Sequence, residues 1–391
     1  MPPLSPVERI PTPLGGTGVS ASVIEHMTEL LDKLRRSELS PYVIGGSLSN
    51  LTQNVAQRMQ VDDFKNDSDG PFAVSRWGFY TTDALAASIS TAVFSNVSAR
   101  FIDNDRKRIL HKTEALLPTI VSIADNAFVL DRPHVMAPDG SFTVMLREQD
   151  VADTTDVYLA LRGTAVVGGL LSAAEVRELS AAGLYPKTLG RDVAWAQGLL
   201  ATFLLGEGTP ALTPAGEMLR LALRGRVAEL RLKLAQAHYG AYSFEGSLAN
   251  IAQNTSSNLP NDAFRNDSGF PVAITRLRAG TYTAVAAAAA GAVFSNVSFK
   301  ITHAGPNRTL TRTRVLAPCL FTISDNEWVF DHPLVLGPDE SLDIGLVEEN
   351  VNATTDVFVA AHGEQVAGLS ATELREAISL GLYQPWKRAT W

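Results

Sequence analysis

Residues 93–98 read Val93-Phe94-Ser95-Asn96-Val97-Ser98, and the same six residues return as Val293-Phe294-Ser295-Asn296-Val297-Ser298. Other matches share this offset of 200: Gly46-Ser47-Leu48 with Gly246-Ser247-Leu248, Asn66-Asp67-Ser68 with Asn266-Asp267-Ser268, and Thr154-Thr155-Asp156-Val157 with Thr354-Thr355-Asp356-Val357. The offset slips only near the end, where Gly183-Leu184-Tyr185 matches Gly381-Leu382-Tyr383. Solenoid repeats have periods of about 20–50 residues, so a period this long indicates two copies of a whole domain.

The repeat predicts the domain organisation. We expect an arm and helix over 1–40, a first domain over 41–187, a helical linker over 188–240, and a second domain with a C-terminal tail over 241–391. The repeat also suggests a filter for important residues. A residue kept in both copies serves the fold or a shared function, whereas a residue present in one copy is required by neither.

The composition is that of a soluble globular protein. The chain has 391 residues, 46% of them apolar, and each unit of roughly 150 residues can bury its own core. The apolar runs fall short of the ~18 residues of a membrane span. Residues 1–5 lack the basic and apolar regions of a secretory signal. Cys319, the one cysteine, excludes an internal disulfide, and Thr119 at the matching position predicts a small core residue.

The charge balance argues against nucleic acid as a partner. The net charge is −8 and the pI is near 5.4. Acidic or apolar residues interrupt the most basic segments, which are residues 106–108 and 224–233. A nucleic-acid binder needs a basic footprint on one face, and no such footprint is visible here.

Each copy begins with a predicted helix. In the first copy, Ile24, Met27, Leu30, Leu31 and Leu34 recur at helical spacing, and the helix is expected to end before Ser40-Pro41. The second helix is expected from about Thr213-Pro214 to His238, because Thr is a good N-cap and Pro suits the first turn. Residues 1–18 indicate an extended arm, and the apolar residues 188–210 indicate a linker helix.

The rest of each copy predicts an antiparallel β-sandwich of the jelly-roll type. Short alternating strands are expected at residues 72–77, 97–101, 128–130 and 156–163, and again at 272–277, 297–301, 328–330 and 356–363. We expect Pro138-Asp139-Gly140 to link residues 134–136 and 142–146 as a hairpin, with Pro338-Asp339-Glu340 doing the same in the second copy. Turn signals without a βαβ rhythm favour a sandwich. Ser172 and Ser370, each three residues before a Glu, predict capping boxes of a short closing helix.

Catalytic constellations are missing from the sequence. Seven histidines are present and none recurs at its paired position, and no HxxxH, HExxH or CxxC spacing predicts a zinc site. No GxSxG elbow is present, and Gly15-Gly16-Thr17-Gly18 lacks the features of a phosphate-binding loop. The sequence therefore predicts no enzymatic activity, no cofactor and no required metal.

Acidic residues do recur, at Asp67/Asp267, Asp125/Asp325, Asp131/Asp331, Asp139/Asp339, Glu148/Glu348 and Asp156/Asp356. Most lie beside Asn, Pro, Gly or Ser, where Asp commonly caps turns, so turn chemistry is the favoured interpretation. Two alternatives stay open. Calcium could use loop oxygens, although no EF-hand spacing is present, and a glycosidase would need two acids facing each other across a cleft. Arg76 and Arg276 are expected to form structural ion pairs.

Some apolar residues predict core positions and others an interface. Phe94, Phe294 and Trp328, which aligns with Phe128, are expected in the cores. The small residues at 86–90 and 286–290 allow either close approach of another surface or a helical turn. The candidate interface comprises Trp386, Trp391, Tyr383, Pro11 and Pro13, because a Pro-rich arm and a tail with two tryptophans are costly to leave in water.

A family resemblance rests on the recurring order of turns and strands: Phe-X-Asn-Asp-Ser with a Pro before a strand, then Asp-X-Pro, Pro-Asp, and the closing Thr-Thr-Asp-Val-(Tyr/Phe)-(Leu/Val)-Ala-(Leu/Ala)-(Arg/His)-Gly. This order resembles the jelly-roll decoration, cement and minor head or neck proteins of tailed-phage virions. The resemblance covers both copies but not the helices. It implies a non-enzymatic structural protein of the virion, assembled in the host cytoplasm.

The same resemblance implies other virion proteins and copies of the chain itself as partners, in a homo-oligomer or a larger assembly. It implies neither nucleic acid nor a membrane as a partner. Three alternatives remain at the level of sequence: a carbohydrate- or receptor-binding β-sandwich module, a double-jelly-roll major capsid protein, and an enzyme such as a polysaccharide lyase or glycosidase.

Overall fold

The computed structural model describes residues 21–52, 54–83, 97–110, 114–121, 127–149, 155–182, 184–185, 212–251, 255–283, 296–322, 326–349, 355–383 and 385. The first half contains α1 (Ala21–Arg36), β1 (Glu38–Leu51), β2 (Gln57–Arg58), β3 (Phe72–Asp83), β4 (Val97–Asp103), β5 (Arg108–Ile109), β6 (Ala115–Leu116), α3 (Leu117–Ile120), β7 (Ala127–Met136), β8 (Phe142–Glu148), β9 (Thr155–Val167) and α4 (Ala173–Ala181). The second half contains α6 (Pro214–Gln236), β10 (His238–Ile251), β11 (Ser256–Asn258), β12 (Val272–Thr283), β13 (Val297–His303), β14 (Arg308–Thr309), β15 (Val315–Leu316), α8 (Ala317–Leu320), β16 (Glu327–Leu336), β17 (Leu342–Glu348), β18 (Thr355–Ala367) and α9 (Ala371–Ser379).

Each half is a β-sandwich of two antiparallel sheets. The first domain has the strand orders β1-β9-β3-β7 and β2-β8-β4-β5, with β6 also paired to β4. The second has the orders β10-β18-β12-β16 and β11-β17-β13-β14, with β15 also paired to β13. In both domains the last strand lies between the first and the third, which is the strand order of a jelly roll. The predicted fold class is therefore confirmed.

Strand pairing in the two domains follows the same register. Tyr42 pairs with Gly163, and Tyr242 pairs with Gly363, in the long ladders β1–β9 and β10–β18. Both ladders shift register at the same place, between Leu48 and Leu51 in the first and between Leu248 and Ile251 in the second. The residue pairs of the first ladder thus recur in the second ladder at the offset of 200 residues that the sequence repeat has.

The expected hairpin at Pro138-Asp139-Gly140 is wrong, and so is its counterpart in the second copy. The turn joins β7 to β8, but β7 pairs with β3 in one sheet and β8 pairs with β4 in the other. Asp139 has a left-handed φ of 61° and Asp339 a φ of 64°, so the turn chemistry itself is as expected. A tight turn fixes only the reversal of the chain, whereas the jelly roll carries these strands into opposite sheets.

The repeated Asn-Asp-Ser motif fastens a turn in each domain. Asn66 is fully buried, and its Nδ2 donates to the carbonyl oxygens of Gly70 at 3.0 Å and Ala137 at 2.9 Å. Its Oδ1 accepts a 2.6 Å hydrogen bond from the hydroxyl of Ser68. Asn266 makes the same kind of bonds in the second domain. The motif therefore recurs because it satisfies buried backbone groups.

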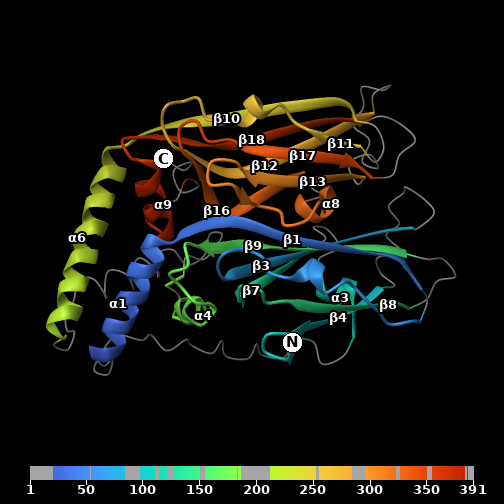
Figure 1. The fold of residues 1–391 in the computed structure, drawn as a ribbon, viewed down its shortest axis with the longest axis horizontal. Coiled ribbons are helices and arrows are strands. Elements are labelled where there is room, and N and C mark those ends of the chain that lie inside the picture. Colours follow the sequence, from blue (N-terminus) through green and yellow to red (C-terminus); the bar gives the residue numbers. More distant parts are fainter. Residues whose placement is uncertain are drawn as a thin grey trace, which may run out of the picture.

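Helices α1, α6 and α9 lie together at one end of the sandwiches, where α1 contacts both α6 and α9 (Figure 1). The apolar stripe of α1 is buried in one cluster with Leu223, Val227 and Leu230 of α6. Thr213 caps α6 by accepting from the amide of Gly216 at 3.1 Å, as predicted. The capping boxes at Ser172 and Ser370 are confirmed.

The two sandwiches are stacked, and α8 of the second lies between the domains, against β3 and β9 of the first (Figure 1). β1 of the first domain also contacts β15 and β16 of the second. Both β1 and β10 begin ahead of the expected boundaries at residues 41 and 241. Residues 86–90, 286–290 and 188–210, together with Phe94 and Phe294, lie outside the described residues.

Candidate protein interaction surface

The sheet β1-β9-β3 of the first domain is buried on both faces. One face covers the core of its own sandwich. The other, here called the first outer face, carries Val43, Tyr80 and Ala160, which lie in one apolar cluster with Val315 and Leu320 of the second domain. These three side chains are at most 1% exposed. An apolar surface-to-surface contact is thus made within the chain, between its two domains.

Backbone atoms hold this contact in register. Val43 pairs with Thr311 in a parallel bridge, its amide donates to Leu310 at 2.8 Å, and its carbonyl accepts from the amide of Arg312 at 2.9 Å. The hydroxyl of Thr313 donates to the carbonyl oxygen of Gly45 at 2.7 Å. Residues 308–320 therefore form one part of the second domain that docks, and this segment is called the docking side. Strand β16 of the second domain contacts β1 and β9 as well.

Two glycines permit the close approach of the docking side. A β-carbon on Gly45 would stand 3.0 Å from a methyl group of Val315. A β-carbon on Gly78 would stand 2.7 Å from the carbonyl oxygen of Cys319, which is backbone and cannot move aside alone. Burial raises the pKa of the Cys319 thiol to about 12, and the side chain is a core residue as predicted.

Polar contacts surround the apolar centre of the contact. Ser75 donates to the carboxylate of Asp331, whose pKa is raised by burial. The hydroxyl of Thr164 lies 2.9 Å from Nδ1 of His332.

Ion pairs lie toward the edge of the same contact. Arg308 reaches Glu38 at 2.6 Å, and Arg312 binds the carboxylate of Asp67 and the backbone of Asp62. The acid that recurs at position 67 thus takes part in the contact between domains.

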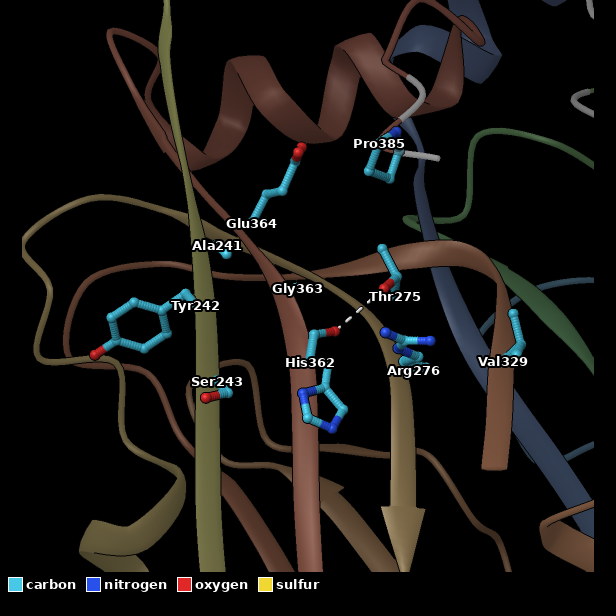
Figure 2. Close-up of a pocket in the computed structure, with 10 residues that line it drawn as sticks. All are labelled: Ala241, Tyr242, Ser243, Thr275, Arg276, Val329, His362, Gly363, Glu364 and Pro385. Atoms are coloured by element: carbon cyan, nitrogen blue, oxygen red, sulfur yellow. Dashed lines mark hydrogen bonds between the residues drawn. The ribbon is translucent and has the colours of Figure 1, made fainter. Parts of the chain in front are cut away.

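The matching face of the second domain, the second outer face, is open. Ser243 and Glu245 replace Val43 and Gly45 and are exposed, as is Arg278, which replaces Gly78. Phe358, which corresponds to Tyr158, is 47% exposed. Figure 2 shows part of this face, with Ser243 on β10, His362 on β18 and Arg276 on β12, whereas the ring of Tyr242 points away from them and packs beside Phe244.

Two shallow depressions lie along the second outer face. One of about 590 Å³ is lined by residues of β10, β12, β16 and β18 and by Pro385 (Figure 2). Another of about 750 Å³ is lined by residues that include Glu245, Arg278 and Phe358. Arg276 and Arg278 share the carboxylate of Glu327, at 3.1 and 2.9 Å, so the expected structural ion pair of Arg276 is formed with an acid that does not recur.

His362 is one of the titratable groups that line the first depression, together with Arg276 and Glu364. Partial burial lowers its pKa, and Arg276 and Arg278 lower it further. In the described part of the chain, no group of three His, Cys, Asp or Glu side chains could hold a metal ion. No helix of these ranges is long and apolar enough to span a membrane.

The recurring acids mostly serve turns and strands. Lys65 reaches Asp139 at 2.7 Å, and Arg265 reaches Asp339 at 2.7 Å. Asp156 accepts from the amide of Asn50 at 2.8 Å. These contacts agree with turn chemistry, which the sequence favoured over catalysis.

Among the predicted interface residues, Tyr383 is described, and it is 3% exposed. Its hydroxyl donates to Glu364 at 2.8 Å, so it packs on its own domain. Trp386, Trp391, Pro11 and Pro13 lie outside the described residues.

The residues of the docked contact were missed by the sequence reasoning because most of them differ between copies. The usable signal was the pair of substitutions Gly45 to Glu245 and Gly78 to Arg278, which marks a face covered in one copy and open in the other.

Comparison with known proteins adds little. No family model and no curated protein matches the chain. Among solved structures, the VP2 subviral particle of infectious bursal disease virus is similar at 9% identity, covering 89% of this chain and 75% of that chain with a TM-score of 0.20. The PBSX exported protein XepA is similar at 8% identity, covering 83% and 86% with a TM-score of 0.17, and the Momordica charantia 7S globulin at 9%, covering 84% of each with a TM-score of 0.13. Similarities this low establish neither a shared fold nor a function.

Proposed function

We propose that the chain is a non-enzymatic structural protein of a virion, which decorates, cements or joins a capsid or its connector through protein–protein contacts. The observation that carries this proposal is the docking of a whole sheet face. The first outer face is buried by backbone pairing at Val43, apolar packing around Tyr80 and ion pairs such as Arg308–Glu38. Such a surface serves to hold protein against protein, and a jelly roll presents it on a rigid framework.

The polar groups of the described residues support the same proposal. Several recurring acids pair with a base or with a backbone amide, as Asp139 does with Lys65 and Asp156 with the amide of Asn50.

One of the two depressions contains a histidine, His362, whose pKa is lowered by partial burial and by the nearby Arg276 and Arg278. An enzyme would place a nucleophile, a base and an orienting group in mutual reach. Ser243, His362 and Glu364 line one depression, but in the described part of the chain no hydrogen bond joins these three side chains, and Glu364 accepts from Tyr383 instead.

The direct test uses particles from the source of the chain. These are separated on a density gradient and probed with antibodies raised against the purified protein. We expect the chain to co-sediment with intact particles, and immunogold labelling to place it on the outside of the head or at the connector. Recovery of the chain only from the soluble fraction would overturn the proposal.

A second candidate is a carbohydrate- or receptor-binding module, which the exposed Phe358 beside a depression of about 750 Å³ favours. A glycan array with the wild-type protein and Phe358→Ala distinguishes it. Binding lost in the variant would favour the module, whereas no binding leaves the structural role. A major capsid protein would instead form closed shells from the purified chain alone, which electron microscopy detects.

A further inference from the structure

Helix α6 is apolar on two opposite sides. One side packs in the cluster that contains α1, through Leu223, Val227 and Leu230. The helix stands at one end of the molecule with α1 on its inner side (Figure 1). On the opposite side of α6, apolar and small residues recur in alternating steps of three and four. This set is here called the α6 seam: Met218, Leu221, Gly225, Ala228, Leu232 and Ala235.

The α6 seam is exposed along its whole length. Met218 is 73% exposed, Leu232 is 58% exposed and Leu221 is 51% exposed. The small residues of the seam, such as Gly225 and Ala228, are exposed as well. Single exposed apolar residues are ordinary on a protein surface, whereas a continuous row of them along one side of a helix marks a contact site.

Gly225 lies in the middle of the seam, and a β-carbon added there would meet nothing within 4 Å in the described part of the chain. Glycine weakens a helix interior relative to alanine. The packing of α6 on its own chain therefore gives no reason for a glycine at this position. Close approach of a second backbone supplies one.

The seam is not a feature of the sequence repeat. At the offset of 200, Glu25 of α1 stands where α6 has Gly225. Asp32 of α1 corresponds to Leu232, and it pairs with Arg35 of its own helix at 2.8 Å. The fold that the two copies share therefore does not require the seam, which belongs to α6 alone.

The spacing of the seam is that of a two-stranded coiled coil. In such a pair, the residues in alternating steps of three and four on one helix meet the same positions of a second helix. Helix α6 has 23 residues and is about 34 Å long. It is already held in place by its packing on α1, so docking a second helix requires little additional ordering. A second copy of α6 has the same length and the same spacing.

The charges beside the seam favour a parallel pair of α6 helices. Arg224 and Arg231 lie on one flank, and neither forms an ion pair in the part of the chain that the structure describes. In a parallel pair, Arg224 comes opposite Glu229 of the second copy, and twofold symmetry makes this contact twice. Glu229 binds Arg226 and Lys233 of its own helix, at 2.8 and 3.0 Å, and a carboxylate can accept further donors. An antiparallel pair would instead bring Arg224 opposite Arg231, and like charges repel.

We propose that the α6 seam docks a second copy of this chain, through a parallel contact between the two α6 helices across a twofold axis. Gly225 of each copy admits the backbone of the other, and Met218, Leu221 and Leu232 pack in layers along the pair. The sandwiches of the two chains lie on opposite sides of the pair, because the buried side of α6 is opposite its seam. This inference holds whether or not the chain belongs to a virion.

Cross-linking tests the contact and its direction. Leu221→Cys places a thiol in the seam, while the native Cys319 is 1% exposed. In a parallel pair the two new thiols face each other, so mild oxidation should give a covalent dimer of twice the 41.9 kDa of one chain. Val55→Cys is the matched control, because Val55 is 48% exposed in the first domain, and it should stay a single chain.

Two cross-linking results overturn the proposal. One is a folded Leu221→Cys variant that gives no more dimer than Val55→Cys. The other is a dimer that forms only when Leu221→Cys is mixed with Leu232→Cys, because that result indicates antiparallel helices.

Sedimentation equilibrium over a concentration series measures the same contact without a cross-link. Leu232→Glu should lower the weight-average mass about twofold relative to wild type, because docking would bury the new carboxylate of each copy. Val55→Glu should keep the wild-type mass. Circular dichroism verifies folding, and Ala228→Glu replaces Leu232→Glu if the latter is unfolded. The proposal is overturned if wild type sediments as one chain, or if the folded seam variants keep the wild-type mass.

Discussion

Arg162 of the first domain donates from Nη1 to the carbonyl oxygen of Leu320 in the second domain, over 2.8 Å. The side chain of Arg162 is 4% exposed. It reaches from β9 to the C-terminal end of α8, where backbone carbonyls lack helical partners. At the matching position the second domain has His362, on its open face. One side chain of β9 thus binds the backbone of the neighbouring domain directly.

We expect Arg162→Ala to weaken the contact between the domains by about 1.5–3 kcal/mol, the usual contribution of a hydrogen bond to a charged group. The single thiol reports the change, because Cys319 is 1% exposed beneath this contact. A thiol reagent should label Cys319 faster in the variant than in wild type. His362→Ala is the control and should leave labelling unchanged; equal rates in all three proteins would contradict the assignment.

Gly78→Arg should separate the domains more completely, since the β-carbon alone would stand 2.7 Å from the carbonyl oxygen of Cys319. We expect a larger radius of gyration in small-angle scattering and two melting transitions in place of one. Gly280→Arg is the matched control, because a β-carbon on Gly280 meets nothing within 4 Å. A single transition in Gly78→Arg with wild-type scattering would show that the contact tolerates the side chain.

The fold could be predicted from the sequence because its signals are local and occur twice. The capping boxes at Ser172 and Ser370, the Thr213 cap and the alternation in the strands each depend on neighbouring residues. The pairing of β7 and β8 could not be predicted in the same way. The turn at Asp139 specifies a reversal, and the partner of each strand is decided by the packing of two sheets.

The surface through which the two domains dock could not be predicted from the sequence, for a different reason. The filter that kept only residues shared by both copies discarded Gly45 and Gly78, whose counterparts are Glu245 and Arg278. Both copies need the same inward residues, such as Phe64 and Phe264, but only one copy has its outer sheet face covered. The arrangement of the two domains in the whole chain decides which outer face is covered. Residues that differ between the copies therefore indicate the covered face, and residues that the copies share do not.

Phe64 and Phe264 are fully buried in the cores of the two domains. We expect Phe64→Ala and Phe264→Ala each to lower the free energy of unfolding by ~3–5 kcal/mol, through lost burial and the cavity left behind. Chemical denaturation measures both values. Phe270→Ala is the control in the second domain, because Phe270 is 44% exposed and its loss should cost little. Equal midpoints for Phe264→Ala and Phe270→Ala would be inconsistent with this packing.

Stability should fall in acid partly through Glu340. Burial would raise the pKa of this carboxyl, but hydrogen bonds from His303 and from the amide of Gly337, together with Arg375, lower it to about 2. Because the folded pKa lies below the usual glutamate pKa of 4.5, this contribution is present above pH 4.5 and is lost as the pH falls toward 2. Urea midpoints of wild type and Glu340→Gln should therefore differ most at about pH 7, and the difference should shrink below about pH 4.5 and disappear near or below about pH 2, where the folded carboxyl becomes protonated.

The C-terminal tail provides the last prediction. Tyr383 fastens the chain to its own domain through Glu364, and Pro385 lies at the rim of the depression on the second outer face. Trp386 and Trp391 follow, and tryptophans commonly act as anchors in contacts between proteins. We expect removal of residues 386–391 to lower the mass of the assembly in light scattering while the melting temperature stays near that of wild type. Trp386→Ala with Trp391→Ala should reproduce the loss, and Lys387→Ala should not. An unchanged mass after truncation would mean that the two tryptophans do not hold the assembly together.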